Sequence, residues 1–133
     1  MTTKKINRIL TAKPNLDGHW IGIIVVSKAF KEAGFEVIYG GNMTPLAIAE
    51  SAVQEDVDLI GLSILTPGYM RRIAETIEEL EKRDAGDVPI IVGGIIYEDD
   101  IPGLKDMGVK EVFRPGTPLD DIVEFVHRIE LPQ

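Results

Sequence analysis

The chain has 133 residues, of which 44% are hydrophobic, with a formal net charge of −8 and no cysteine. This length suffices for one domain with its own core, and we expect a single domain over residues 1–133. The lack of cysteine excludes zinc-thiolate sites, iron–sulfur clusters and thiol nucleophiles. The acidic charge argues against nucleic acid or membrane as a partner. The apolar run after Met1–Lys5 is too short for a signal peptide or membrane span, so we expect a cytoplasmic protein.

Short apolar segments alternate with amphipathic segments five times along the chain, which is the pattern of a parallel sheet with helices on both faces. In chain order, predicted strand and helix alternate as 6–12 and 21–33, 35–39 and 44–54, 57–63 and 69–83, 88–92 and 98–107, and 109–113 and 117–129. Thr44-Pro45 and Thr117-Pro118 have the composition of helix starts. We therefore expect an α/β, flavodoxin-like (Rossmann-like), doubly wound fold whose five-stranded sheet has the order 2-1-3-4-5.

Polar residues and glycines gather where the predicted strands end. They are Asp17-Gly18-His19 after the first strand, Ser63 and Leu65 at the third, Gly93-Gly94 after the fourth and Pro115-Gly116-Thr117 after the fifth. Open parallel sheets bind ligands beyond the carboxyl ends of their strands, so these residues predict one site. Paired glycines there suit a ligand lying flat on the backbone, or an ordinary turn. Ser63 can equally satisfy a local backbone group.

Asp17 and His19 form a further candidate pair, at the turn before the first helix. An acceptor on the second ring nitrogen of a histidine fixes its tautomer and raises its basicity as a metal ligand, and Asp17 is placed to do this for His19. Gly22 leaves room at the start of the helix. The alternative is that the Asp17 and His19 turn only caps the helix.

Other cofactors of this architecture lack their motifs. The chain has neither the Gly-x-Gly-x-x-Gly of dinucleotide sites nor the Gly-x-x-x-x-Gly-Lys-Ser/Thr of nucleotide hydrolases. Lys13–Leu16 stands where a flavodoxin-type site needs a hydroxyl- and glycine-rich phosphate loop. The third strand ends in Leu62-Ser63, where a phosphoacceptor receiver needs an aspartate.

Three motifs occur in a characteristic order: Asp17-x-His19-x-x-Gly22, Ser63-x-Leu65 and Gly93-Gly94. In these motifs the chain resembles the cobalamin-binding domain family that takes its cofactor base-off, His-on. The similarity extends from about Ile9 to Phe125. Within that family the chain is most similar to the small subunit or C-terminal cobalamin-binding domain of methylmalonyl-CoA mutase and related acyl-CoA mutases.

The resemblance implies a role for each motif residue. His19 would replace dimethylbenzimidazole as the lower ligand of cobalt, and Asp17 would hydrogen-bond its far nitrogen. The displaced nucleotide tail would enter a slot between the sheet and the first helix, where Ser63 would hydrogen-bond its base. The other implied cofactor contacts are Gly18, Trp20, Ile21, Gly22, Leu65, Gly93, Gly94, Phe113 and Thr117. In acyl-CoA mutases an acidic and then a basic residue usually stand where this chain has Trp20-Ile21, positions that face the corrin rim and the partner subunit.

The resemblance implies a subunit that does not catalyse alone. It would be the cobalamin-binding small subunit of an adenosylcobalamin-dependent acyl-CoA mutase, and a barrel-type large subunit would bind the thioester for carbon-skeleton rearrangement. Assembly of several copies stays open. One alternative is a corrinoid carrier for methyl transfer, although such carriers usually have a helical cap domain and only Met1–Leu16 precede the motif here. Another is a cobalamin-dependent regulator, which would need an output domain.

Overall fold

The computed structural model describes residues 3–14 and 21–132. In chain order the elements are β1 (Thr3–Lys5), β2 (Arg8–Lys13), α1 (Ile21–Glu32), β3 (Glu36–Asn42), α2 (Pro45–Gln54), β4 (Leu59–Ile64), α3 (Tyr69–Glu81), β5 (Ile90–Gly94), the 3₁₀ turn η1 (Glu98–Asp100), α4 (Ile101–Asp106), β6 (Glu111–Phe113), α5 (Leu119–Arg128) and β7 (Glu130–Pro132). None of the helices in this part of the chain has the length and apolar character needed to cross a membrane.

Five strands form one parallel sheet in the order β3-β2-β4-β5-β6. Counted among themselves in chain order, these strands have the predicted order 2-1-3-4-5, so the predicted α/β topology is confirmed. The central strands β2, β4 and β5 are buried at most of their positions because both of their faces are covered by helices.

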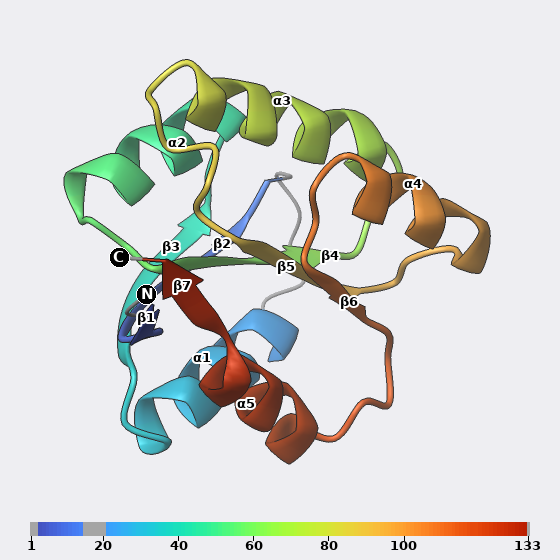
Figure 1. Cartoon of the computed structure of the whole chain (residues 1–133). Coiled ribbons are helices and arrows are strands. Elements are labelled where there is room, and N and C mark those ends of the chain that lie inside the picture. Colours follow the sequence, from blue (N-terminus) through green and yellow to red (C-terminus); the bar gives the residue numbers. More distant parts are fainter. Residues whose placement is uncertain (1–2, 15–20, 133) are drawn as a thin grey trace.

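Helices cover both faces of the sheet, with α2, α3 and α4 on one side and α1 and α5 on the other (Figure 1). Neighbouring residues of a strand point to opposite faces, and β4 shows this directly. Leu59 is fully buried in the core with Phe30 and Val126, whereas Ile60 is fully buried in the core with Ile48 and Ile73. The face with only two helices is the one that carries the cavity described below.

Two predicted helix boundaries have different outcomes. The hydroxyl of Thr44 accepts a hydrogen bond from the amide of Ala47 at 3.1 Å, so the predicted cap of α2 is confirmed. The predicted cap by Thr117 is wrong, because α5 begins at Leu119 and the Thr117 hydroxyl donates to the carbonyl of Arg114 at 2.7 Å. Its side chain closes the turn before the helix instead.

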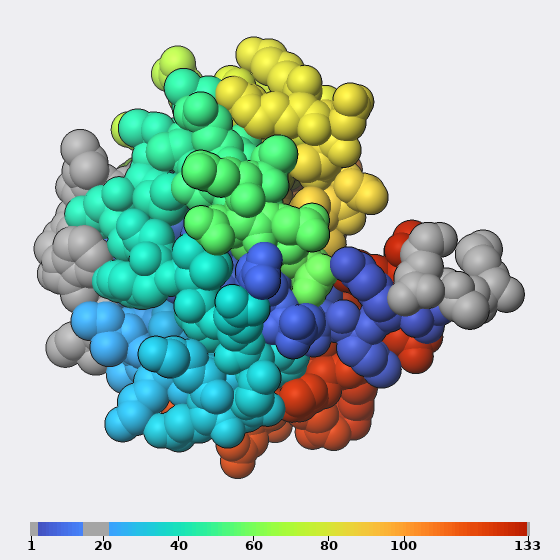
Figure 2. All heavy atoms as spheres, turned by 90° about the vertical axis from the view of Figure 1, so that its left-hand side faces the viewer, coloured from blue at the N-terminus to red at the C-terminus, as the bar shows by residue number. Residues whose placement is uncertain are grey.

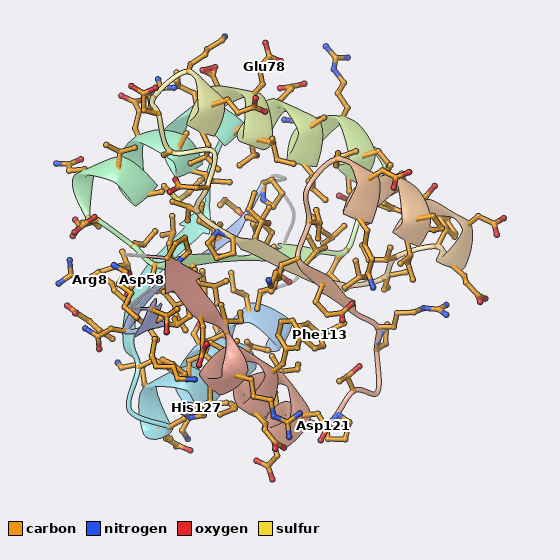
Figure 3. The ribbon with its side chains drawn as sticks, in the orientation of Figure 1. Arg8, Asp58, Glu78, Phe113, Asp121 and His127 are labelled. Atoms are coloured by element: carbon orange, nitrogen blue, oxygen red, sulfur yellow. The ribbon has the colours of Figure 1, made fainter. Side chains whose placement is uncertain are left out.

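A two-stranded antiparallel ribbon of β1 and β7 was not predicted. It brings the two ends of the chain together, and the first (blue) and last (red) described segments share one face in Figure 2. Lys4 on β1 is held by an ion pair between its Nζ and Oδ1 of Asp58, at 2.9 Å. Asp58 also accepts the amides of Asn7 and Arg8 at 2.8 and 2.9 Å, and Arg8 lies beside it in Figure 3.

These contacts change the acidity of Asp58. Burial raises its pKa, but the hydrogen bonds from the Arg8 amide, the Lys4 ammonium and the Asn7 amide outweigh burial, so its pKa lies below the ordinary 3.8. Asp58 directly precedes β4, so this cluster lies at the amino ends of the strands, opposite the edge where the predicted site falls.

Candidate functional site

A cavity of about 380 Å³ lies between α1, α5 and the face of the sheet that these helices cover. Of the predicted cofactor contacts, those that line it are Gly22, Ser63, Leu65, Gly93, Gly94, Phe113 and Thr117. Its walls are otherwise mostly apolar, with Val26 and Phe30 from α1, Ile91 from β5 and Ile122 from α5. The parallel topology therefore brings together residues from four separate segments of the chain.

Four of the predicted residues, Asp17, Gly18, His19 and Trp20, lie outside the described residues. The elements on either side of them are β2 and α1, and both of these elements contribute residues to the cavity wall. Lys13 ends β2 and is fully buried, and Gly22 stands in the first turn of α1, which begins at Ile21, and lines the cavity. The segment that carries His19 therefore joins the carboxyl end of a central strand to a wall of the cavity.

Ser63 offers a hydroxyl to the cavity. It shares one face of β4 with Gly61, since residues two apart in a strand point the same way, and both line the cavity together with Leu65, which directly follows the strand. No hydrogen bond joins the Ser63 hydroxyl to another residue within residues 3–14 and 21–132. The hydroxyl is thus available to a ligand.

The two glycines at the end of β5 differ in the space around them. Gly94 has φ +122°, and a Cβ there would lie 1.9 Å from the carbonyl oxygen of Ile64 on the neighbouring strand. Gly93 has ordinary room, because the nearest atom to a Cβ would be the carbonyl oxygen of Phe113 at 3.6 Å. Sheet packing alone requires Gly94, whereas a side chain at Gly93 fits the fold but would take up space in the cavity.

The end of the cavity beneath β6 is closed by Phe113 and the turn that follows it. The Phe113 ring packs edge-on against Phe125 of α5, with centroids 5.5 Å apart, and Figure 3 shows it between β6 and α5. The turn is fixed by Gly116, which has φ +93°, and by the hydrogen bond from Thr117 to Arg114. Phe113 thus contributes both to the cavity wall and to the core.

The titratable groups with shifted pKa values lie outside the cavity. The carboxyls of Asp58, Glu79 and Glu111 and the phenol of Tyr69 all have shifted pKa values, and none of them lines the cavity. Within the described part of the chain, no group of three or more His, Asp or Glu residues could hold a metal ion. A mostly apolar cavity with a few hydroxyls suits binding better than proton transfer.

The sequence reasoning missed Thr11, which lines the cavity, and its hydrogen-bonded partner Ser27. Thr11 on β2 and Ser27 on α1 are buried and share a hydrogen bond of 2.8 Å between their Oγ atoms. It also gave no weight to Lys13, which is fully buried at the end of β2. The available signal was the presence of Thr11 and Lys13 in a strand that is otherwise apolar after Arg8.

An open parallel α/β domain with an apolar cavity beneath the carboxyl edge of its sheet is a ligand-binding domain. The model of the B12 binding domain family matches residues 7–123 of this chain. The chain therefore belongs to the B12-binding domain family and is a cobalamin-binding domain.

Relatives in this family include free subunits and parts of larger enzymes. The chain is 37% identical over 123 residues to the 2-hydroxyisobutanoyl-CoA mutase small subunit of Aquincola tertiaricarbonis, covering 92% of this chain and 90% of that protein. It is 38% identical over 120 residues to methylmalonyl-CoA mutase of Escherichia coli, covering 90% of this chain but 17% of that protein. The match to the human mitochondrial methylmalonyl-CoA mutase covers 15% of the enzyme at 38% identity.

Solved structures agree on the fold. A cobalamin-binding protein from Desulfitobacterium hafniense superposes with a TM-score of 0.78 at 22% identity, covering 93% of this chain and 59% of that one. The receiver domain of the response regulator NarL from Mycobacterium tuberculosis gives a TM-score of 0.71 at 13% identity, covering 92% and 94%. At these identities the likeness supports the flavodoxin-like architecture only.

Proposed function

We propose that the chain is the cobalamin-binding small subunit of an adenosylcobalamin-dependent acyl-CoA mutase. It would hold the corrinoid base-off, His-on for a carbon-skeleton rearrangement in a barrel-type large subunit. The observation that carries the proposal is the cavity lined by Ser63, Gly93 and Gly22, the last of which is three residues after His19 in the sequence. The mutase small subunit that matches over 90% of its own length supports the subunit assignment.

The cavity fits the nucleotide tail of a base-off corrinoid. Its walls are mostly apolar, as a stacked heteroaromatic base requires, and the hydroxyl of Ser63, which has no hydrogen-bond partner among the described residues, can donate to a ring nitrogen. Gly22 and Gly93 keep the entrance and one wall free of side chains. In this proposal Gly94, Phe113 and Thr117 line the tail slot, and Leu65 packs beside the corrin ring.

His19 would bind cobalt from the lower face, and Asp17 would accept the proton of its other ring nitrogen and so fix the tautomer. Gly18 would keep this turn free of a side chain, and Trp20 and Ile21 would cover the corrin rim or the large subunit. When bound, adenosylcobalamin supplies a cobalt–carbon bond that breaks homolytically to start radical chemistry. The chain's own part is to bind, orient and shield the cofactor.

Reconstitution tests the subunit assignment. The purified chain, loaded with adenosylcobalamin, is mixed with the large subunit of an acyl-CoA mutase, and rearrangement of acyl-CoA substrates is followed together with formation of a complex. We expect that the two subunits form a complex and that the acyl-CoA substrate is rearranged only when this chain is present. Methyl transfer between a donor and a cobalamin-dependent methyltransferase, with no mutase activity, would instead identify the alternative, a corrinoid carrier.

A further inference from the structure

Thr11, whose hydroxyl is hydrogen-bonded to that of Ser27, forms part of the wall of the tail cavity. Thr11 lines the cavity from β2, and Ser27 stands behind it on α1. The two residues expose only 2% and 6% of their surfaces. Gly61, the register partner of Thr11, has no side chain, and a Cβ there would lie 3.8 Å from Cγ2 of Thr11. The neighbouring strand therefore leaves the Cγ2 side of Thr11 uncovered.

The pair has one proton more than its own hydrogen bond uses. Two hydroxyls carry two protons, and the single bond of 2.8 Å between them uses one. Neither hydroxyl has another partner within residues 3–14 and 21–132. A buried donor without an acceptor is costly, and most buried hydroxyls are therefore paired. A polar atom of a ligand in the cavity would complete the pair.

The cavity offers hydroxyls at two depths. Thr11 pairs with Gly61, and Ser63 lies two residues further toward the carboxyl edge, about 6.6 Å along the strand. Ser63 is thus nearer the carboxyl edge of the sheet, and the Thr11 and Ser27 pair is one layer further from that edge. A ligand that satisfies both needs polar atoms on two parts of its ring system.

We propose that the Thr11 and Ser27 pair selects the base of the corrinoid's nucleotide tail and favours a purine over 5,6-dimethylbenzimidazole. This inference rests on the proposed binding of a base-off corrinoid. The outer ring of dimethylbenzimidazole carries two methyl groups and no nitrogen, so it leaves the spare hydroxyl proton unpaired. The outer ring of adenine carries ring nitrogens, and when Ser27 donates to Thr11, one of these nitrogens can accept the remaining proton of Thr11, the member of the pair that lines the cavity.

The test compares two corrinoids that differ only in the base, adenine or dimethylbenzimidazole, by titration against the full chain. The wild type should bind the adenine form roughly fivefold to tenfold more tightly. The double variant Thr11→Val with Ser27→Ala removes both hydroxyls, which costs little stability because no lone partner remains. It should lose this preference, whereas Thr11→Ser, which keeps a hydroxyl, should retain it.

Matched controls separate selection from packing. Thr76 is also fully buried but donates to the carbonyl of Arg72 within α3, so Thr76→Val should leave the preference unchanged. Cobinamide, which lacks the nucleotide tail, should bind the wild type and the double variant alike. Weaker cobinamide binding by the double variant would mean that the pair acts through the fold, which contradicts selection.

The remaining outcomes distinguish the two proposals. If both tailed corrinoids bind with a histidine-ligated spectrum, and the ratio of their affinities is the same in the wild type and the double variant, base selection by this pair is wrong and the proposed function stands. If neither corrinoid binds, the proposed function fails and this inference fails with it.

Discussion

The carbonyl oxygen of Ile64 occupies the place where a side chain at Gly94 would begin, 1.9 Å from the ideal Cβ position. Gly93, one residue earlier, has no atom closer than 3.6 Å to its own ideal Cβ. The two glycines of one motif therefore serve different purposes, and they can be separated by mutation.

Gly94→Ala should damage the fold. The substitution forces an alanine into φ +122° and against a backbone oxygen, which should lower the free energy of unfolding by ~2 kcal/mol or more. Denaturant unfolding of the two proteins measures this loss. Equal midpoints would show that β4 and β5 can separate at no cost, contrary to the geometry.

Gly93→Val should keep the fold and lose the ligand. Its side chain would extend into the cavity from a backbone that tolerates it, so we expect a nearly unchanged unfolding midpoint with corrinoid affinity reduced at least about tenfold, since a blocked slot excludes the tail. Titration with cobalamin, beside cobinamide as the tail-free control, measures the effect. Undiminished cobalamin affinity would remove this wall from the site.

Asp17→Ala should weaken corrinoid binding without abolishing it. If Asp17 orients His19, its removal should cost about 10- to 100-fold in affinity. Equilibrium titration of the variant gives the number, and Asp17→Asn, which keeps a hydrogen-bond acceptor, is the matched comparison. An affinity equal to that of the wild type would return Asp17 to a helix-capping role.

Asp58 should make stability depend on pH. Its pKa is lower in the folded chain than the ordinary 3.8, so its contribution is present at neutral pH and is lost as the pH falls from about 5 toward 2. Asp58→Asn should lower the free energy of unfolding at pH 7 by about 1–3 kcal/mol and flatten this acid dependence. Corrinoid affinity should stay unchanged, because Asp58 lies at the opposite edge from the cavity. If the stability of Asp58→Asn fell with pH as steeply as that of the wild type, the acid dependence would have to come from other carboxylates.

The sheet could be predicted because its signals are local. The apolar run over Leu59–Leu62 and the Thr44-Pro45 helix start are each contained in a few residues, and both match the structure. The β1 and β7 ribbon could not be predicted, because three-residue strands carry no periodicity and their pairing joins Lys4 to Leu131 across the whole chain.

Part of the site could also be predicted from local sequence motifs. Motif residues such as Ser63 and Gly93 stand at strand ends, and a parallel topology brings strand ends together, so their convergence on one cavity follows from the fold. The contact between Thr11 and Ser27 depends on how α1 crosses β2, which no local pattern encodes. The cap by Thr117 was predicted wrongly because a Thr-Pro pair suits both a helix cap and the turn before a helix.

The central claim is that His19 is the lower ligand of cobalt. Isotope labelling tests this claim most directly. The chain is prepared with ¹⁵N-labelled histidine, loaded with cob(II)alamin, and the electron paramagnetic resonance spectrum is recorded. His127→Ala serves as the matched control, since His127 stacks on Phe35 with centroids 4.6 Å apart and is exposed on α5. Histidine ligation predicts a doublet splitting from ¹⁵N that His19→Ala abolishes and His127→Ala keeps. A triplet from unlabelled nitrogen would show that the benzimidazole base still holds cobalt, and would contradict the account.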